Sequence, residues 1–407
     1  MVLPSLTALR QLAGRRIFLR VDVNVPLAAE GRTMLVVNDW RIRTALPTVE
    51  FLVSRGALVV IGAHLGRPEG KKVVALSLKP VAAHLARLLK HPVSFVETIP
   101  AKASLAAQKP GSLVMLENLR FYPGEEADDA AFAKKLAALA DAYVNDAFAE
   151  CHRKHASVAA ITEYLPSYAG FLLQKEVEAL RAVQHAPKRP MVVVLGGAKV
   201  EGKLSVLRAL LGVADNVVAG GLLYVAYLHA RDYRIGGQTF ADEVLGQADA
   251  LVGKRKVFRP VDVVVGHADG SDAQAHELVR GGHLRVEPGH EIFDIGPESI
   301  LQIGMLLEKA HTIIWNGAMG KFEQHPYEYG TYAIARMMGA AALRGAFTVA
   351  GGGETIQALE DVGVRDKLSH VSTGGGAMLA FLAGAPMPGI EALVSARHPG
   401  SPPAAGR

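Results

Sequence analysis

The sequence contains a single cysteine, Cys151, among its 407 residues, so no disulfide can form within the chain. This excludes the disulfide frameworks of small secreted proteins and suits a reducing compartment, so we expect a cytoplasmic protein. Charged residues make up only 20% of the chain, whereas half of the residues are apolar. Such a composition excludes a largely disordered protein and provides for sizeable hydrophobic cores.

Long apolar runs are missing as well. The longest, Val217 to Leu228, covers about a dozen residues, short of the roughly 20 that a bilayer requires. The first ten residues include a proline and lack the basic start and apolar run of a secretory signal. The net charge of +5 suits anionic partners, but the arrangement of lysines and arginines does not single out nucleic acid. We therefore expect small anionic ligands, with no membrane and no nucleic acid as partners.

Short apolar runs, each followed by a polar or glycine-rich motif and a helix-like segment, recur along the whole chain. Runs of this length are typical of buried parallel strands, and apolar residues at helical spacing lie between them. The alternation in both halves predicts an α/β fold with two doubly wound parallel-sheet (Rossmann-like) domains. The predicted strands are Ile17–Val21, Leu58–Ile61, Leu113–Leu116, Ala142–Val144, Met191–Leu195, Val217–Val218, Val261–Val265, Ile292–Phe293, Thr312–Trp315, Phe347–Ala350 and His370–Thr373.

A helix and a linker are predicted to join the two domains. Apolar residues recur at helical spacing between Gly170 and Gln184, and a proline-containing stretch, Ala186–Pro190, follows. We predict an N-terminal domain over 1–170, an interdomain helix and linker over 171–190, and a C-terminal domain over 191–385. Residues 395–407, rich in Pro, Gly and Ala, are expected to form a disordered tail.

Basic and polar side chains follow the predicted strands of the first half. In open α/β sheets, ligands bind beyond the carboxyl ends of the strands, and guanidinium groups grip carboxylate and phosphate oxygens in pairs. A lone arginine there is more often a solvated surface charge, but several converging arginines favour a site for a small, multiply charged anion. These residues are Arg20, Asp22, Asn24, Arg41, His64, Arg67, Arg120 and Arg153.

Glycine takes the corresponding place in the second half. Glycine-rich turns that enter helices offer backbone N–H groups, and the helix dipole favours bound phosphate. Four such turns raise the prediction of a nucleotide site above that of ordinary tight turns: Gly196-Gly197, Gly220-Gly221, Gly352-Gly353 and Gly374–Gly376. Lys199 and Lys203 are four residues apart and lie on one face if this segment is helical.

Two alternatives remain open. Gly197 to Lys203 has the spacing of a P-loop, but Leu204 stands where the Mg²⁺-binding Ser or Thr belongs, so we interpret the match as accidental. Cys151, His152 and His155 beside Asp146 have the residue types of a metal site. Zinc sites generally need four well-spaced ligands, so a packed thiol and hydrogen-bonded histidines are favoured.

Taken together, the motifs resemble those of the phosphoglycerate kinase family. They occur in the family's order from about residue 16 to 390. The first half carries RVDVNVP (20–26), HLGRP (64–68), ENLRF (117–121) and NDAF (145–148), and the second half carries GGAKV (196–200), DIGP (294–297), WNG (315–317) and HVSTGGG (370–376).

The resemblance implies a two-lobed, hinged, monomeric kinase of glycolysis. In this family the phosphoryl group passes reversibly from 1,3-bisphosphoglycerate to ADP, giving 3-phosphoglycerate and ATP, and Mg²⁺ accompanies the nucleotide. A divergent nucleotide-binding paralogue without this activity is the alternative. The family also implies that the segment of about 386–394 returns to the first domain.

Site residues follow from the same resemblance. It implies that Asp22, Asn24, Arg41, His64, Arg67, Arg120 and Arg153 hold the glycerate substrate. It implies that Gly197, Lys199, Lys203, Gly220, Asn316, Glu323, Gly353, Glu354 and Thr355 surround the nucleotide, with Glu354 at the metal. It also implies that Arg20, Lys199, Gly375 and Gly376 act on the transferring group.

The chain departs from the family pattern at several positions, most of them on the nucleotide side. Glu354 stands where the Mg²⁺-binding Asp is usual, and it is one methylene longer. Gly202 replaces an expected Asp, Ala149 a Gly and Ala318 a Pro, and Leu222–Tyr224 is unlike the usual sequence near the adenine. These changes bear on nucleotide affinity and base preference more than on the class of reaction.

Overall fold

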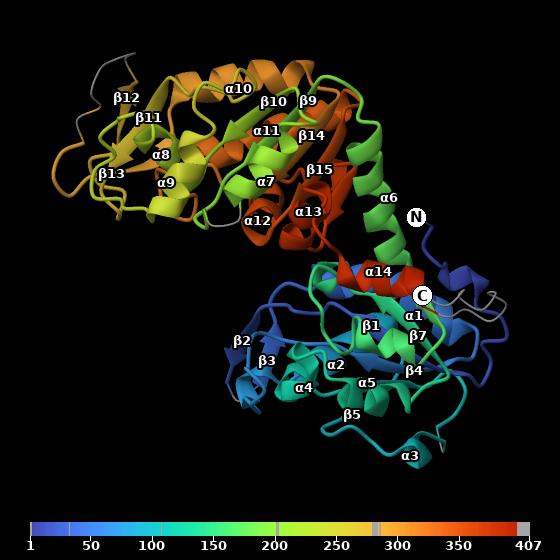
Figure 1. The fold of residues 1–407 in the computed structure, drawn as a ribbon. Helices are drawn as coiled ribbons and strands as arrows, with labels where there is room; N and C mark the ends of the chain where they lie inside the picture. Colours follow the sequence, from blue (N-terminus) through green and yellow to red (C-terminus); the bar gives the residue numbers. More distant parts are fainter. Residues whose placement is uncertain are drawn as a thin grey trace. The chain divides into compact units, whose positions relative to one another are not determined.

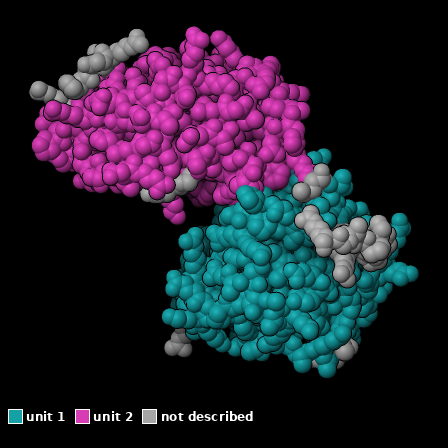
Figure 2. All heavy atoms as spheres, in the orientation of Figure 1, with its two compact units in different colours: residues 1–178, 386–407 teal, residues 179–385 magenta. Residues whose placement is uncertain are grey.

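The computed structural model describes residues 2–31, 33–106, 108–200, 203–278, 284 and 286–396. Two predictions from the sequence, the departure at Gly202 and most of the disordered tail (residues 397–407), concern residues outside the described ranges. The chain divides into two compact units, Met1–Glu178 with Pro386–Arg407, and Ala179–Ala385, coloured separately in Figure 2. The first of the two boundaries, between Glu178 and Ala179, falls inside helix α6 (Phe171–His185). None of the described helices is both long enough and apolar enough to cross a membrane.

The first unit contains a six-stranded sheet in which every neighbouring pair is parallel. The four predicted runs are its inner strands, and two strands that were not predicted form its edges. In sheet order the strands are β5 (Val93–Val96), β6 (Leu113–Leu116), β4 (Leu58–Gly62), β1 (Arg16–Val21), β7 (Ala142–Asp146) and β8 (Ser167–Ala169). In register, Arg20 of β1 lies opposite Gly62 on one side and Asn145 on the other, so the carboxyl ends of these strands are level.

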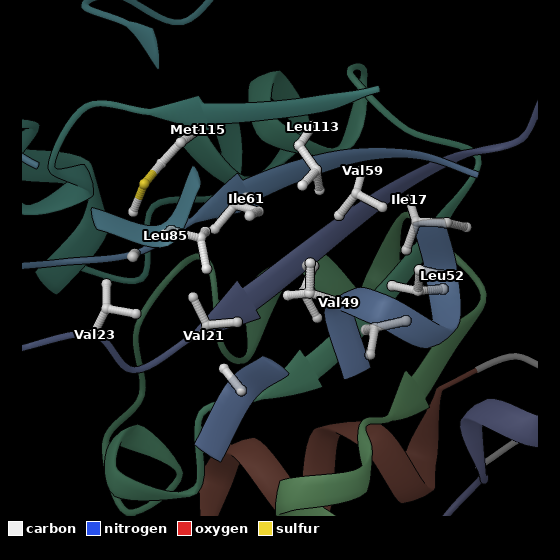
Figure 3. Close-up of a cluster of buried hydrophobic side chains, with 14 of the residues drawn as sticks. Ile17, Val21, Val23, Val49, Leu52, Val59, Ile61, Leu85, Leu113 and Met115 are labelled. Carbon is white, nitrogen blue, oxygen red and sulfur yellow. The ribbon is translucent and has the colours of Figure 1, made fainter. Parts of the chain in front are cut away.

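Alternate residues of the inner strands build a hydrophobic core with helix α1 (Trp40–Ser54) and helix α2 (Lys79–Leu89). Successive side chains of a strand point to opposite faces, so this core takes every second residue. Figure 3 shows Ile17 and Val21 of β1, Val59 and Ile61 of β4, and Leu113 and Met115 of β6 gathered with Val49, Leu52 and Leu85 from the two helices. The residues between them, such as Phe18 and Val60, are also fully buried. Burial on both faces is the environment that parallel strands require.

The remaining elements of the first unit are short or lie at its periphery (Figure 1). They are the hairpin β2 (Leu27–Glu30) and β3 (Thr33–Val36), helices α3 (Lys102–Ala106), α4 (Pro123–Glu126), α5 (Ala130–Ala137) and α14 (Pro388–Ser395), and 3-10 turns at Leu6–Ala8, Val74–Leu76, Leu119–Phe121, Phe148–Glu150 and Ala160–Glu163. Helix α14 is tied to this unit because the Gly389 N–H donates to Cys151 O at 3.0 Å. Ser395, which was predicted to begin the tail, is the last residue of this helix.

The second unit contains a five-stranded parallel sheet. Its strands in order are β10 (Asn216–Ala219), β9 (Met191–Leu195), β14 (Thr312–Asn316), β15 (Phe347–Gly351) and β16 (His370–Ser372). Its helices are α7 (Lys203–Leu210), α8 (Gly221–His229), α9 (Asp242–Asp249), α10 (Pro297–Lys309), α11 (Tyr329–Leu343), α12 (Gly353–Asp361) and α13 (Gly375–Leu382), and a 3-10 turn covers Arg365–Lys367. Two parallel-sheet α/β units confirm the predicted fold class.

Two runs predicted as strands of this parallel sheet do not belong to it. The runs at 261–265 and 292–293 are β11 (Asp262–Gly266) and β13 (Glu291–Ile295), which pair antiparallel in a separate sheet with β12 (Gln274–Glu277). A parallel pair needs a long crossover connection, usually a helix. The described residues between β11 and β13 contain no helix, and β12 and β13 lie on either side of β11, both antiparallel to it.

Candidate active site

Arg20 lies near the carboxyl end of the central strand β1, and its side chain is fully buried. Its guanidinium donates to Ser157 Oγ at 2.8 Å and to Val21 O at 2.5 Å. Another nitrogen of the fork lies 3.3 Å from His64 Nδ1 and 3.9 Å from Glu125 Oε1. Such a buried cation requires counter-charge and hydrogen bonds to be stable, and Glu125 and Ser157 provide both.

The chain that leaves β1 places Asp22 and Asn24 beside this arginine. The buried Asp22 carboxylate accepts from Arg41 at 2.5 Å and from the Asn24 N–H at 3.0 Å. Asn24 Oδ1 in turn accepts from the Gly66 N–H at 3.0 Å, which joins the β1 and β4 loops. The Arg41 side chain is about a quarter exposed, so it can still reach a ligand while Asp22 holds it.

Glu150 lies among the remaining predicted basic residues. Arg120 donates to its Oε2 at 2.8 Å, and His64 Nε2 lies 3.3 Å from Oε1. Arg153 approaches Oε2 to 3.9 Å. Arg67 is exposed and, within the part of the chain that the structure describes, forms no ion pair. The predicted anion-binding residues of the first half therefore lie around the ends of β1, β4, β6 and β7, with Arg67 at the surface.

Burial shapes the electrostatics of this crevice. Burial, reinforced by the charges of Arg20 and Arg120, holds the pKa of His64 well below its usual value, so the ring is neutral near pH 7. Since Nδ1 faces a guanidinium donor, Nε2 carries the proton and faces Glu150. Burial also raises the pKa of Glu150, although Arg20 and Arg120 act in the opposite direction.

The sequence did not reveal the acidic residues of the crevice. Glu125, at the end of helix α4's single turn, accepts both the Ser157 hydroxyl at 2.5 Å and the Ser157 N–H at 3.0 Å. Glu150 precedes Arg153 by three residues, the spacing of a helical ion pair, and this was the one available signal. Their convergence on Arg20 and Arg120 appears only in three dimensions.

The alternative metal site near Cys151 finds no support among the described residues, where no cluster of three or more His, Cys, Asp and Glu side chains could hold a metal ion. The Cys151 thiol is fully buried, and burial raises its pKa far above the usual value, so it is not a thiolate. Burial likewise lowers the pKa of His155 to about 3. These groups are packed and neutral, as a structural role requires.

Asp146, the last residue of β7, provides a test of stability against pH. Its Oδ1 accepts the Leu173 N–H at 3.1 Å, whereas Oδ2 is buried without a hydrogen-bond partner. Burial raises the pKa of this carboxyl to about 7. In the unfolded chain it titrates near pH 4. Its protonated form therefore stabilises the fold below about pH 4, and that contribution is lost as the pH rises through about 7.

We expect Asp146→Asn to remove this dependence. Relative to the variant, the wild-type chain should lose up to about 1.4 kcal/mol of unfolding free energy per pH unit between about pH 4 and 7. Urea unfolding midpoints of both proteins, measured at half-unit intervals, provide the comparison. Midpoints that run parallel across this range would contradict the assignment.

In the second unit, Asn316 at the end of β14 joins the two neighbouring loops. Its Nδ2 donates to Gly351 O at 2.7 Å and lies 3.5 Å from Gly375 O. The buried Thr355 hydroxyl accepts the Gly317 N–H at 2.6 Å. These bonds fix the ends of β14, β15 and β16 against one another.

Helices α12 and α13 begin side by side at this edge of the sheet. A Cβ on Gly375 would lie only 2.6 Å from Gly352 Cα and 2.7 Å from its nitrogen, so the two helix starts are in backbone contact. First-turn N–H groups have no intrahelical acceptor. The two helices therefore direct several free donors, together with their dipoles, toward the same region, which is an arrangement that binds phosphate.

Gly375→Ala and Gly376→Ala form a matched pair for this contact. The first adds a methyl group against backbone, and overpacking of this kind costs about 1–3 kcal/mol. The second adds the same group where no heavy atom lies within 4 Å. It should be neutral or stabilise by about 0.5 kcal/mol, because alanine narrows the unfolded ensemble. Thermal unfolding of the two variants should therefore differ clearly, and equal midpoints would show that the helix starts are not tightly packed.

A pocket of about 350 Å³ opens beside these turns. Of the predicted nucleotide residues, Gly197, Glu323 and Glu354 line it, whereas Gly220 does not, and its N–H donates to Leu195 O. Asn316, Gly353, Thr355, Lys199 and Lys203 are outside the lining. The apolar part of the wall includes Leu222 and Ala318, which the sequence singled out as departures on the nucleotide side, and Val225, Ile292, Phe293 and Met319, which it did not.

The two predicted lysines differ in their surroundings. Lys203 opens helix α7, donates to Gly196 O at 2.6 Å, and has its pKa lowered by burial, with Glu354 acting in the opposite direction. Lys199 is exposed. Glu354 begins the first turn of α12, and its Oε2 lies 3.4 Å from the Ala318 nitrogen. The P-loop alternative lacks its hydroxyl, because Leu204 is buried in α7.

Two parallel α/β units, one with a group of arginines and one with a glycine-rich pocket at their strand ends, define a two-unit α/β enzyme of the phosphotransferase class. The sequence profile of the family described as "Phosphoglycerate kinase" matches residues 6–385. The chain belongs to the phosphoglycerate kinase family. It is accordingly a kinase of glycolysis that transfers a phosphoryl group between 1,3-bisphosphoglycerate and ADP.

Individual relatives agree along nearly the full length. A phosphoglycerate kinase of Synechococcus elongatus is 43% identical over 402 residues, covering 96% of this chain and 98% of the relative. That of Moorella thermoacetica is 44% identical over 391 residues, covering 94% and 97%. The solved structure of phosphoglycerate kinase from Coxiella burnetii matches with a TM-score of 0.81 at 36% identity, covering 97% of this chain and 100% of that one. The Pyrococcus horikoshii enzyme gives 0.84 at 32% identity, covering 96% and 98%.

Proposed function

We propose that the arginine crevice of the first unit holds 3-phosphoglycerate or 1,3-bisphosphoglycerate, and that the pocket of the second unit holds ADP or ATP. The observation that carries this proposal is that each unit places the groups that suit one ligand at the carboxyl ends of its parallel strands. Side chains with fixed positive charge gather at the carboxyl ends of one parallel sheet, whereas free N–H donors and a partly apolar pocket gather at those of the other.

On the glycerate side, Arg41, Arg67, Arg120 and Arg153 neutralise the carboxylate and phosphate of the substrate. Asp22 and Asn24 orient the loops, since Asp22 holds Arg41 and Asn24 holds the Gly66 N–H. Neutral His64 donates one hydrogen bond through Nε2. Arg67 is exposed and forms no ion pair within the described ranges, so it can bind substrate without breaking an existing ion pair.

On the nucleotide side, the apolar wall around Leu222 and Phe293 takes the base, and Gly197 in the lining lets the backbone approach the phosphates. Gly220 and Gly353, outside the lining, belong to the turns that enter α8 and α12. Glu323 lines the pocket at its exposed edge, where ribose hydroxyls would find an acceptor. Asn316 and Thr355 hold the turns in place, and Lys203 adds a positive charge beside Glu354.

Mg²⁺ enters with the nucleotide. The exposed Glu354 carboxylate at the start of α12 provides the hard oxygen ligand that Mg²⁺ prefers, and Mg²⁺ usually takes only one or two carboxylates beside substrate phosphates. When bound, the ion neutralises charge on the phosphates. Glu354 therefore fits the role of a Mg²⁺ ligand, and its carboxylate extends one methylene farther from the backbone than that of the usual Asp.

Transfer proceeds in line from the acyl phosphate to an ADP oxygen, so no protein nucleophile is needed. Positioning and charge neutralisation account for most of the catalysis in such reactions. Arg20 and Lys199 stabilise the equatorial oxygens of the moving group, and the first-turn N–H groups at Gly375 and Gly376 add neutral donors. The glycerate oxygens stay bound to the first unit throughout.

The two proposed ligand sites belong to different units, so direct transfer requires a closure that brings the ligands together and excludes water. We propose the segment 170–190, which includes α6, as the hinge. The working form is proposed to be a cytoplasmic monomer that needs neither a membrane nor nucleic acid.

A coupled assay of ATP consumption, run with and without 3-phosphoglycerate and Mg²⁺, tests the proposal. Turnover that requires both supports it. Hydrolysis of ATP without 3-phosphoglycerate would point to a P-loop enzyme, and absence of turnover under all conditions would point to a binding protein. Nucleic-acid binding, if present, would weaken steeply with salt.

A further inference from the structure

Glu150 lies where the groups proposed to bind the glycerate substrate converge. Its two carboxylate oxygens lie 2.8 Å from Arg120 Nη2, 3.3 Å from His64 Nε2 and 3.9 Å from Arg153 Nη1. His155 Nδ1 is a further 3.7 Å contact. The Glu150 side chain is only 8% exposed. An anion of this chain thus occupies the centre of a predicted anion site.

This placement creates a competition. A substrate carboxylate or phosphate bound by Arg120, Arg153 and His64 would lie close to the Glu150 carboxylate, which already accepts from Arg120 Nη2 at 2.8 Å and faces His64 Nε2 at 3.3 Å. A second anion brought into the same group of donors is repelled by the first, because charges a few ångströms apart interact strongly when they are partly shielded from water. The ion pair between Arg120 and Glu150 is not a solvent-screened surface pair with a negligible interaction energy, because the two side chains are only 2% and 8% exposed.

We propose that Glu150 is a built-in competitor of the glycerate substrate, an internal carboxylate that holds Arg120, Arg153 and His64 when the crevice is empty and is displaced when substrate binds. The inference rests on the proposed glycerate site. It makes Glu150 a positioning residue that sets substrate affinity. It also favours ligands with several negative charges, since a weak monoanion cannot replace a resident carboxylate.

Two features of the crevice support displacement over a fixed structural bond. Glu150 contacts Arg153 only at 3.9 Å and His155 only at 3.7 Å, so two of its four contacts are longer than hydrogen bonds and are lost at little cost. Burial also raises the pKa of its carboxyl, so the charged form of Glu150 is less stable at this site than in water. By contrast, Glu125 is tied to Ser157 by two short hydrogen bonds and is fixed.

The test compares Glu150→Gln with Glu126→Gln. Both variants remove one negative charge next to the same guanidinium, because Glu126 lies 3.3 Å from Arg120 Nε. Glu126 is about 38% exposed and, among the described residues, pairs only with Arg120. Calorimetry should give a dissociation constant for 3-phosphoglycerate about tenfold lower for Glu150→Gln. For Glu126→Gln it should stay within about twofold of wild type, because water screens the charge of the partly exposed Glu126 carboxylate.

Steady-state kinetics separate this role from a general structural one. In Glu150→Gln the KM for 3-phosphoglycerate should fall about tenfold, with kcat and the KM for ATP within about threefold of wild type. If the glutamine variant fails to fold, Glu150→Asp replaces it. Its carboxylate, one methylene shorter, loses reach toward Arg120, so it should tighten binding by a smaller factor.

Unchanged or weaker binding by these variants overturns the proposal. Arg67→Ala, measured in parallel, separates this outcome from failure of the glycerate site itself. Where Arg67→Ala weakens 3-phosphoglycerate binding but Glu150→Gln does not tighten it, only the role of Glu150 is wrong. Where Arg67→Ala also leaves binding unchanged, the crevice is not the substrate site and both proposals fall.

Discussion

Replacing Lys199 with alanine is expected to lower kcat by about 100- to 1000-fold, the range for loss of one group that stabilises transition-state charge. The dissociation constant for 3-phosphoglycerate should stay within about twofold, because Lys199 belongs to the second unit and the proposed glycerate site to the first. The side chain is exposed, so its loss should not affect folding. ATP consumption in a coupled assay and calorimetry with 3-phosphoglycerate measure the two quantities.

Lys254→Ala is the matched control. Lys254 is also exposed, lies in the same unit, and follows α9 away from the glycine-rich turns, so its removal changes net charge equally. Its kcat should equal that of wild type. Near-normal turnover in Lys199→Ala would show that this ammonium does not contact the transferring group, and Lys203, which is tied to Gly196 O, would become the candidate.

The inner strands of both parallel sheets could be predicted from the sequence because burial on both faces requires continuous apolar runs. The edge strands β5 and β8 of the first sheet could not, whereas β10 and β16, the edges of the second sheet, were predicted as the runs Val217–Val218 and His370–Thr373. Strand β5 is only partly buried and β8 has three residues, so neither gives a run of that kind. The same signal also misled, because a run such as Val261–Val265 carries no information about the direction of its partner. In the structure its two neighbours, β12 and β13, are both antiparallel to it.

The residues of the candidate site also fall into those that could and those that could not be predicted. Motif residues at strand ends, such as Arg20 and Arg120, could be predicted because parallel strands end at one edge of a sheet. Glu125 and Glu150 could not, because each lies more than twenty residues along the chain from the arginine that it faces. Apolar pocket residues such as Phe293 were missed for a different reason. In sequence they are indistinguishable from core positions.

Arg20→Lys should reduce kcat and stability together. The substitution keeps the charge but removes the fork, and a single ammonium cannot replace the bonds to Ser157 Oγ and Val21 O while also facing His64 and Glu125. Each buried group left without its partner costs about 1–3 kcal/mol, so the free energy of unfolding should fall by about 2–5 kcal/mol. The loss in kcat should reach about 100-fold or more if Arg20 stabilises the equatorial oxygens.

Arg16→Lys, at the other end of the same strand, separates the two effects. Arg16 forms two guanidinium hydrogen bonds to Asp141 at a partly exposed site, so its replacement should cost about 1 kcal/mol, less than that of Arg20, and leave kcat unchanged. Measuring kcat for Arg20→Lys well below its unfolding temperature ensures that the lower activity does not reflect unfolded protein. If Arg20→Lys is destabilised but keeps the wild-type kcat, the role of Arg20 is only structural, namely to hold Glu125 and Ser157 in place. Because Arg20 is fully buried in the structure, a large loss of kcat would further imply that the guanidinium becomes accessible to the moving phosphoryl group during the catalytic cycle.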